Sequence, residues 1–144
     1  MPSRDAEALQ HRVVEFVRAF GLHRPDETPC GAPVPVSEAH ALGVLAEAGP
    51  LSQNELAKHL HLTKSTVSRL IDQLTRRGWV ERKPSDHDGR QRLIELTAAG
   101  RKSADQLASR RAERMQRLLD RIPVADRAAV IAALDALVEA ADED

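Results

Sequence analysis

The feature that most constrains this chain is a pair of helices separated by a turn of about three residues. Ser52 followed by Glu55 forms a capping box, which predicts a short helix from there to about Leu60. Thr63 then stands where the N-cap of a second helix is expected, and Gly78 marks the end of that helix. A short helix, a tight turn and a second helix in this order form a helix-turn-helix.

The second helix has two chemically different faces. Apolar residues recur with the i, i+3, i+4 and i+7 spacing that places them on one core-facing stripe, and they are Val67, Leu70, Ile71 and Leu74. The opposite face carries Ser65, Arg69, Asp72 and Arg76, flanked by Lys64, Thr66, Ser68 and Gln73. Because amphipathic helix pairs are common, the segment after Gly78 decides what this pair is.

Two short strands are predicted after Gly78. Residues 79–83 and 92–96 have the composition of strands, and SDHDGRQ provides the turn between them. Two strands alone are marginally stable, so we expect the hairpin to pack on the preceding helices. A helix-turn-helix followed by a hairpin with a basic tip is a winged helix.

Further helices are expected on both sides of this winged helix. One spans about residues 3–20, and Ser37 stands where another would have its N-cap, ending near Ala48. Thr97 is expected to cap a long helix to about residue 122, and Pro123 stands at the start of a last helix. The sequence therefore predicts a mainly α fold with a two-stranded β wing.

Length and charge narrow the class of protein. The 144 residues are enough for about one domain with a real core. Residues 52–92 contain nine Lys and Arg and five Asp and Glu, whereas residues 122–144 contain one Lys or Arg and six Asp and Glu. The middle of the chain is therefore basic and its end acidic, which indicates that a polyanion binds the middle. Cys30 is the only cysteine, and no apolar run has the length of a membrane span or signal peptide. A cytoplasmic location is therefore expected.

Residues 36–100 resemble the core of the MarR family of bacterial transcription regulators. The resemblance rests on LSQNELAKHL and on LTKSTVSRLIDQLTRRGWVERKPSDHDGRQRLIELTAAG. The spacing familiar from the family's wing and following helix is present at Asp88, Gly89, Arg90, Leu96, Thr97 and Gly100. The helices outside this region fit the family by arrangement only.

The resemblance implies a homodimeric repressor on a pseudo-palindromic site in double-stranded DNA. Residues 1–35 and 98–144 would form a helical dimerisation region, and residues 36–97 the winged helix-turn-helix DNA-binding region. The residues themselves support a dimer, because apolar stripes on the last helices would have little to bury against in a monomer. These residues are Ile122, Val130, Ile131, Leu134, Leu137 and Val138. A coiled-coil tail is the alternative, but the stripe is too short for three or four heptads.

The helix over residues 64–76 is expected to enter the major groove. An arginine can donate two hydrogen bonds to guanine and a hydroxyl can serve several bases, so the residues expected near base edges are Ser65, Thr66, Ser68 and Arg69. The residues expected at phosphates, near the two ends of the helix, are Thr63, Lys64, Arg76 and Arg77.

The wing is expected to reach the minor groove. Arg90 is the predicted inserted side chain, because a narrow A·T-rich groove concentrates the negative potential that a guanidinium can meet. Asp88 would support the loop by accepting hydrogen bonds, and Gly89 would allow a turn with positive φ. Arg92 is either a phosphate contact or an internal partner of Asp88.

Three kinds of signal compete for what the protein senses. In the family, effectors bind near the meeting point of the first two helices, which implies a neighbourhood that contains His23, Cys30, Glu38 and His40. A small aromatic or lipophilic ligand is the family's commonest pattern, and oxidation of Cys30 is the second hypothesis. Zinc bound by these residues is the third, although residues 97–122 contain no histidine. No resident cofactor is otherwise expected.

The main competing function is a winged helix that binds another protein and no DNA. This alternative predicts an acidic or apolar outer face on residues 64–76, whereas the face carries hydroxyl groups and arginines. An enzyme is not expected, since the chain has no coherent arrangement of Ser, His and Asp and no glycine loop that would bind phosphate.

Overall fold

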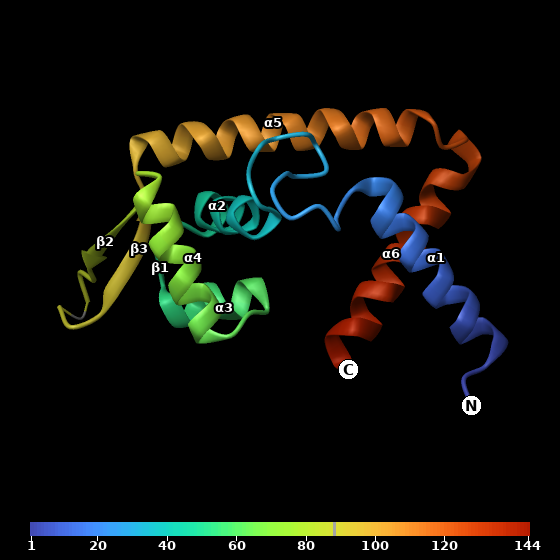
Figure 1. Cartoon of the computed structure of the whole chain (residues 1–144), viewed down its shortest axis with the longest axis horizontal. Coiled ribbons are helices and arrows are strands. Elements are labelled where there is room, and N and C mark those ends of the chain that lie inside the picture. The colour runs from blue at the N-terminus through green and yellow to red at the C-terminus, as the bar shows by residue number, and fades with distance from the viewer. Residues whose placement is uncertain (88) are drawn as a thin grey trace. The chain divides into compact units, whose positions relative to one another are not determined.

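The computed structural model describes residues 1–87 and 89–144 and has a mainly helical fold with one small sheet, as predicted (Figure 1). The elements in chain order are α1 (Arg4–Phe20), α2 (Val36–Ala48), β1 (Leu51–Ser52), α3 (Gln53–Leu60), α4 (Lys64–Arg76), β2 (Val80–Pro84), β3 (Arg92–Leu96), α5 (Ala98–Asp120) and α6 (Val124–Glu143). The chain divides into two compact units, Met1–Arg110 and Arg111–Asp144, and the winged helix lies in the first. In the described part of the chain, no helix has the length and apolar character needed to cross a membrane.

The capping box at the start of α3 is present as predicted. Ser52 Oγ accepts a hydrogen bond from the Glu55 backbone N–H at 3.2 Å, and Glu55 Oε1 accepts one from the Ser52 N–H at 3.4 Å. The first turn of α4 is capped in the same manner, because Thr63 Oγ1 accepts from the Thr66 N–H at 3.3 Å. Both helices of the pair therefore begin where the sequence predicts.

The predicted N-cap of α2 is wrong. The helix begins at Val36, one residue before Ser37, and Pro35 occupies the N-cap position without a side-chain hydrogen bond. The proline ring holds φ at −55°, close to a helical value, so the chain enters the helix directly after it. Ser37 consequently lies inside the first turn.

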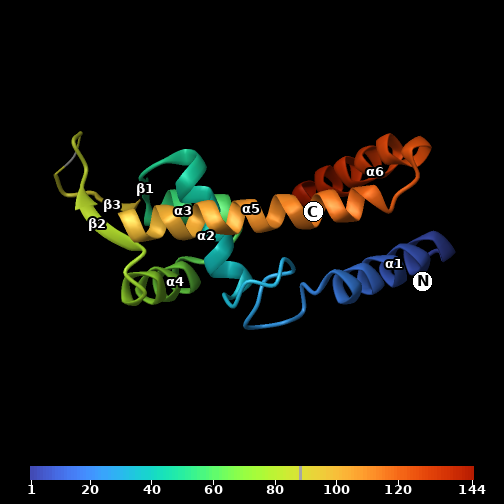
Figure 2. The same cartoon turned by 90° about the horizontal axis from the view of Figure 1, so that it is seen from above.

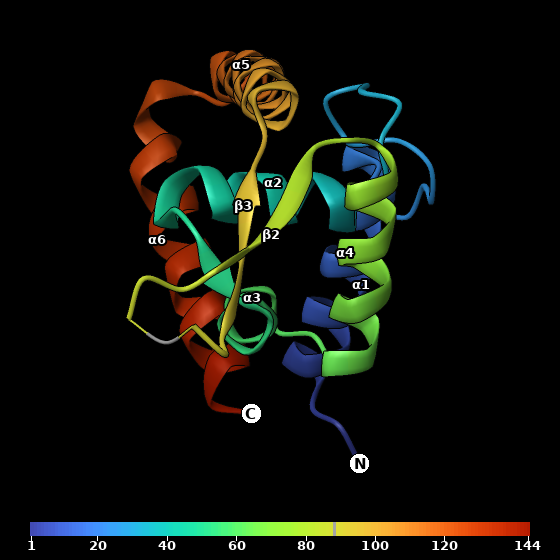
Figure 3. The same cartoon turned by 90° about the vertical axis from the view of Figure 1, so that its left-hand side faces the viewer.

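The wing belongs to a three-stranded antiparallel sheet in the order β1-β3-β2 (Figure 1), and its two long strands, β2 and β3, are labelled in Figure 3. The sequence predicts only the two wing strands. The strand that it misses, β1, pairs Leu51 with Ile94 and is two residues long, too short for an alternating pattern.

The predicted start of β2 is also one residue early. The Trp79 N–H donates to Leu74 O at 3.1 Å, so Trp79 completes the end of α4 and the strand begins at Val80.

The core of the first unit joins the helix-turn-helix to the wing. The predicted apolar stripe of α4 is buried along its whole length, and Val80 and Ile94 bring the wing strands into the same cluster. Its largest fully buried side chains are Leu42, Leu45, Leu56, Val67, Ile71, Leu74 and Ile94. Each such side chain contributes about 1.5–3 kcal/mol through burial, so the wing strands are fixed to the helices by packing.

The first turn of α5 lies against the backbone that joins α4 to β2. Thr97 Oγ1 accepts from the Gly100 N–H at 3.0 Å, which confirms Thr97 as a cap, and it donates to Gly78 O at 2.6 Å. The Thr97 N–H donates to Trp79 O at 3.0 Å. A Cβ on Gly100 would collide with this same Trp79 carbonyl, so the close approach requires glycine.

We expect Gly100→Ala to lower the free energy of unfolding by about 2–3 kcal/mol, because the added methyl group collides with backbone shared by α4 and β2. Helix propensity alone would favour alanine by about 1 kcal/mol, so the sign of the change separates the two effects. Urea denaturation measures it. Ala108→Gly, at an exposed position of α5, is the control and should cost about 1 kcal/mol. A Gly100→Ala variant as stable as the wild type would contradict the close contact.

Candidate nucleic-acid interface

The turn between α3 and α4 depends on His61. Among the described residues it alone combines a side chain with a positive φ, 54°. In this left-handed conformation the His61 N–H donates to Lys58 O at 3.3 Å, and the Leu62 N–H donates to Ala57 O at 3.1 Å. These bonds end α3 and allow α4 to begin after only three residues.

The polar face of α4 is open to solvent, on the side opposite its buried stripe. Its exposed members are Lys64, Ser65, Arg69, Asp72, Gln73 and Arg76, and its half-buried members are Thr66 and Ser68. Every residue that the sequence places on this face therefore lies outside the core. The structure brings the candidate base contacts and the candidate phosphate contacts onto one helix surface.

The hydroxyl groups at the start of α4 form a small cluster that the sequence does not reveal. Thr63 Oγ1 lies 3.2 Å from Ser65 Oγ and 2.8 Å from Thr66 Oγ1, in addition to its bond with the Thr66 N–H. Gln53 Nε2, on α3, donates to Lys64 O at 3.4 Å. The first turn of α4 is thus held in place before any ligand binds.

The wing loop carries two of the predicted DNA contacts. The Ser85 N–H donates to Gln91 O at 2.8 Å and closes the loop, while Ser85 Oγ accepts from the His87 N–H at 3.2 Å. Arg90 and Arg92 are both exposed. Figure 2 shows the loop projecting away from the helices of the first unit. Asp88 lies outside the described residues, so its supporting role and that of Gly89 stay predictions.

Two cations of strand β2 lie beside carboxylates. Lys83 Nζ lies 3.3 Å from Glu81 Oε1 and 3.4 Å from Glu95 Oε2, and the hydrogen bonds to these two carboxylates raise the pKa of Lys83. Arg82 Nη2 lies 3.5 Å from Asp72 Oδ1, which links β2 to the outer face of α4. The acidic residue on that face is thereby paired with a cation from the wing.

Arg77 and Glu38 have positions that differ from the expected ones. The sequence predicts a phosphate contact for Arg77 and an effector or zinc role for Glu38. Instead the Arg77 guanidinium is bound to the Glu38 carboxylate at 2.6 Å, and Glu38 is buried. The Glu38 carboxylate is therefore committed to a contact within the protein, while 38% of the Arg77 side chain stays exposed.

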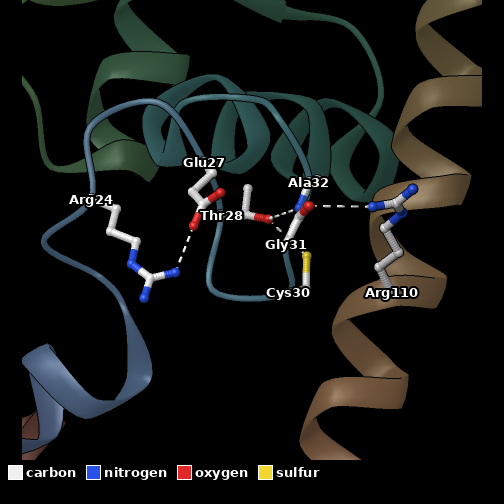
Figure 4. Close-up of polar contacts among 7 residues, drawn as sticks. All are labelled: Arg24, Glu27, Thr28, Cys30, Gly31, Ala32 and Arg110. Atoms are coloured by element: carbon white, nitrogen blue, oxygen red, sulfur yellow. Dashed lines mark hydrogen bonds and ion pairs between the residues drawn. The ribbon is translucent and has the colours of Figure 1, made fainter.

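The other effector candidates lie in or near the loop between α1 and α2. Cys30 is half-buried with Sγ 2.8 Å from Thr28 Oγ1, which also accepts from the Ala32 N–H at 3.1 Å (Figure 4). Arg110 Nη1 donates to Gly31 O at 3.5 Å and joins this loop to α5. His23 and His40 are exposed. Within residues 1–87 and 89–144, no three His, Cys, Asp or Glu side chains are grouped to bind a metal ion.

These elements define a class of protein. A short helix, a three-residue turn, an outer helix with hydroxyl and guanidinium groups, and a β-hairpin with arginines at its tip form a winged helix-turn-helix of the kind that binds duplex DNA. The outer face of α4 is neither acidic nor apolar, which argues against the protein-interaction alternative.

Comparison with known sequences gives the family. Residues 32–91 match the model of the MarR family. The multiple antibiotic resistance protein MarR of Salmonella typhimurium is 31% identical over 84 residues, which cover 58% of this chain and 58% of that protein. The winged-helix region of the chain is that of the MarR family, and the chain is a DNA-binding transcription regulator, not an enzyme.

Solved structures share the fold. The PcaV transcriptional regulator of Streptomyces coelicolor, also solved in complex with its natural ligand, gives a TM-score of 0.74 at 21% identity, covering 94% of this chain and 98% of that one. FabT of Streptococcus pneumoniae in complex with DNA gives 0.72 at 23% identity, covering 97% and 96%. At these identities the likeness concerns the fold alone, but it extends to the N- and C-terminal helices.

We expect Thr63→Val to lower the free energy of unfolding by about 1 kcal/mol, because valine keeps the shape of threonine and removes the hydroxyl that caps α4. Thr63→Ser retains that hydroxyl and serves as the control. Chemical denaturation of the two variants in parallel gives the difference. Equal stability of the valine and serine variants would show that the cap contributes nothing.

Proposed function

We propose that this regulator is a homodimeric repressor that binds a pseudo-palindromic DNA site and is released by a small-molecule effector. The DNA-binding mode rests on one observation above all, the solvent-open face of α4 with its basic and hydroxyl side chains. Two proteins with this fold support the proposal, since FabT is solved in complex with DNA and PcaV with its natural ligand. A cytoplasmic location follows from the proposed target.

In this proposal α4 enters the major groove and its middle contacts bases. Arg69, at the centre of the outer face, would donate twice to a guanine, and Ser65 and Ser68 would contact neighbouring bases. Lys64 and Arg76 lie at opposite ends of the helix and would bind phosphates on the two sides of the groove. The capped first turn adds the partial positive charge of a helix N-terminus beside one phosphate.

The wing would place Arg90 in the adjacent minor groove. Glu81 and Glu95 both lie beside Lys83 in the strands of the hairpin, so we assign the DNA contacts of the wing to the arginines of its tip. Arg92 begins β3 and would contact the phosphate at the edge of the groove. A narrow A·T-rich minor groove flanking the major-groove site is the expected target.

The dimer would be formed by the helices outside the winged helix. Neither α1 nor α6 contains a buried residue, although both carry apolar stripes. The large exposed apolar side chains of α1 are Leu9, Val13, Val14 and Phe16, and those of α6 are Val124, Val130, Ile131, Leu134 and Val138. Stripes of this size are stable in water when a partner covers them, and a second copy of the chain supplies matching ones.

The proposed dimer also gives a mechanism of release. Two copies of α4 must lie roughly 34 Å apart to enter successive major grooves. A ligand that binds better to a dimer with another spacing must weaken DNA binding, and DNA weakens the ligand equally. A small molecule near the α1–α2 loop is the preferred effector, with oxidation of Cys30 or a metal ion as the alternatives.

A gel-shift titration with duplexes selected from a random library tests the function. Binding that weakens steeply with rising salt supports a regulator that neutralises phosphates. No retardation of any duplex at low salt would refute it. Native mass spectrometry and metal analysis of the freshly purified protein would distinguish a co-purified small molecule from an oxidised cysteine or a bound metal.

We expect Arg90→Ala to weaken binding to the selected duplex by about tenfold, because a guanidinium is lost from the minor groove. The salt slope should fall by about one unit. Titration at several salt concentrations measures both, and Lys102→Ala, an exposed cation on α5, is the control that should change neither. Unchanged affinity of the Arg90 variant would refute the wing contact.

We expect Leu134→Asp to raise the dissociation constant of the dimer at least about 100-fold, because an unpaired carboxylate would be buried where two apolar stripes meet. Sedimentation analysis over a range of protein concentrations measures it. Asp135→Asn, at the neighbouring exposed position, should leave the dimer intact. A Leu134→Asp variant that dimerises like the wild type would exclude α6 from the interface.

A further inference from the structure

Glu38 is the one buried charged side chain among the described residues. It belongs to α2, and only 4% of its side-chain surface is exposed. A carboxylate in such a place is costly unless a cation and hydrogen bonds compensate it. Both of its oxygens are engaged by Arg77, 39 residues along the chain: Oε1 accepts from Nε at 2.6 Å and Oε2 from Nη2 at 3.4 Å.

Arg77 is held from a second side by Trp79. The guanidinium carbon lies 4.9 Å from the centroid of the indole ring, within the range of a cation–π contact. Arg77 is the residue that ends α4, and Trp79 directly precedes β2. One guanidinium therefore joins α2, the end of the helix proposed to enter the major groove, and the start of the wing.

Stability alone does not account for such an arrangement. Only Glu38 of this pair is buried, and an ion pair with a buried charge is on average no more stabilising than well-packed apolar side chains of the same size. The ion pair differs from apolar packing in its fixed geometry, because the two hydrogen bonds to Glu38 and the stack on the Trp79 ring both restrict the orientation of the Arg77 guanidinium. Gly78 lies between Arg77 and Trp79 and has a φ of 76°. As a glycine it places little restriction by itself on the direction in which the chain leaves α4.

We infer that Glu38 and Arg77 are positioning residues for DNA binding, which fix the angle between α4 and the wing so that both grooves are met at once. This inference rests on the proposed DNA-binding mode, in which the two elements act together. It replaces the predicted phosphate contact of Arg77 and the predicted effector role of Glu38. Arg77 then supports affinity without touching DNA.

The test compares wild type, Glu38→Gln, Arg77→Met and the double variant on a duplex selected by the wild type from a random library. Glutamine keeps the size of Glu38 and methionine much of the length of Arg77, while each removes one charge of the pair. We expect each single variant to bind about tenfold more weakly and the double variant no more weakly than either, as for residues that act as one unit.

The salt dependence separates positioning from direct contact. If Arg77 bound a phosphate, Arg77→Met would lower the salt slope by about one unit and Glu38→Gln would not. A positioning pair leaves the slope unchanged in both variants. Hydroxyl-radical footprinting gives a second readout, since we expect the minor-groove protection by the wing to weaken although Arg90 is intact.

A matched control and a folding check complete the experiment. Arg24 pairs with Glu27 at the same 2.6 Å but outside the winged helix, so Arg24→Met should leave affinity and slope unchanged. Circular dichroism establishes that each variant is folded at the temperature used. If Arg77→Met does not fold, Glu38→Gln and Arg77→Lys, which retain more of the contact, take its place.

Two results would overturn the inference. One is unchanged affinity in folded Glu38→Gln and Arg77 variants, and the other is a slope lowered only in the Arg77 variant. A wild-type protein that binds no duplex from the library would overturn the proposed function together with the inference. Wild-type binding with unaffected variants overturns the inference alone.

Discussion

The carbonyl group of Trp79 is the point on which the winged helix depends. It accepts the Thr97 N–H, and the bare Cα of Gly100 lies against it, while the N–H of the same tryptophan ends α4 and its ring stacks on Arg77. Trp79 therefore contacts the end of α4, the start of the wing and the first turn of α5. A displacement of α5 must therefore move the base of the wing and the end of α4 together, because the hydrogen bonds and close packing around Trp79 leave no room for α5 to move alone.

Charge is distributed to serve this framework as well as DNA. On β2, Arg82 and Lys83 are paired with Asp72, Glu81 and Glu95, and Arg77 at the end of α4 is paired with Glu38. The outer face of α4 and the tip of the wing carry the exposed cations that are proposed to meet DNA. In the proposed DNA-binding mode, specificity comes from geometry, because a few defined positions and not a uniformly basic surface meet the DNA.

The fold followed from local signals, and the exceptions have physical reasons. The capping box of α3, the N-cap of α4 and the buried stripe of α4 were predictable because they depend on residues three or four apart. Strand β1 was not predictable, because two residues form a strand only when β3 is already in place. Ser37 is not the N-cap of α2, because Pro35, with its fixed φ, occupies that position. The α4 surface was predictable from its residue types. The partner of Arg77 was not, because it lies 39 residues away and nothing in local spacing brings Glu38 to it.

The short strand β1 protects the protein against unwanted assembly. By pairing with β3 it covers one side of the sheet and leaves β2 as the longer open edge. That edge is five residues long, ends in Pro84 and carries Glu81, Arg82 and Lys83, all features that discourage another chain from adding a strand. The hairpin that is proposed to reach DNA can therefore be exposed to solvent without offering a template for aggregation.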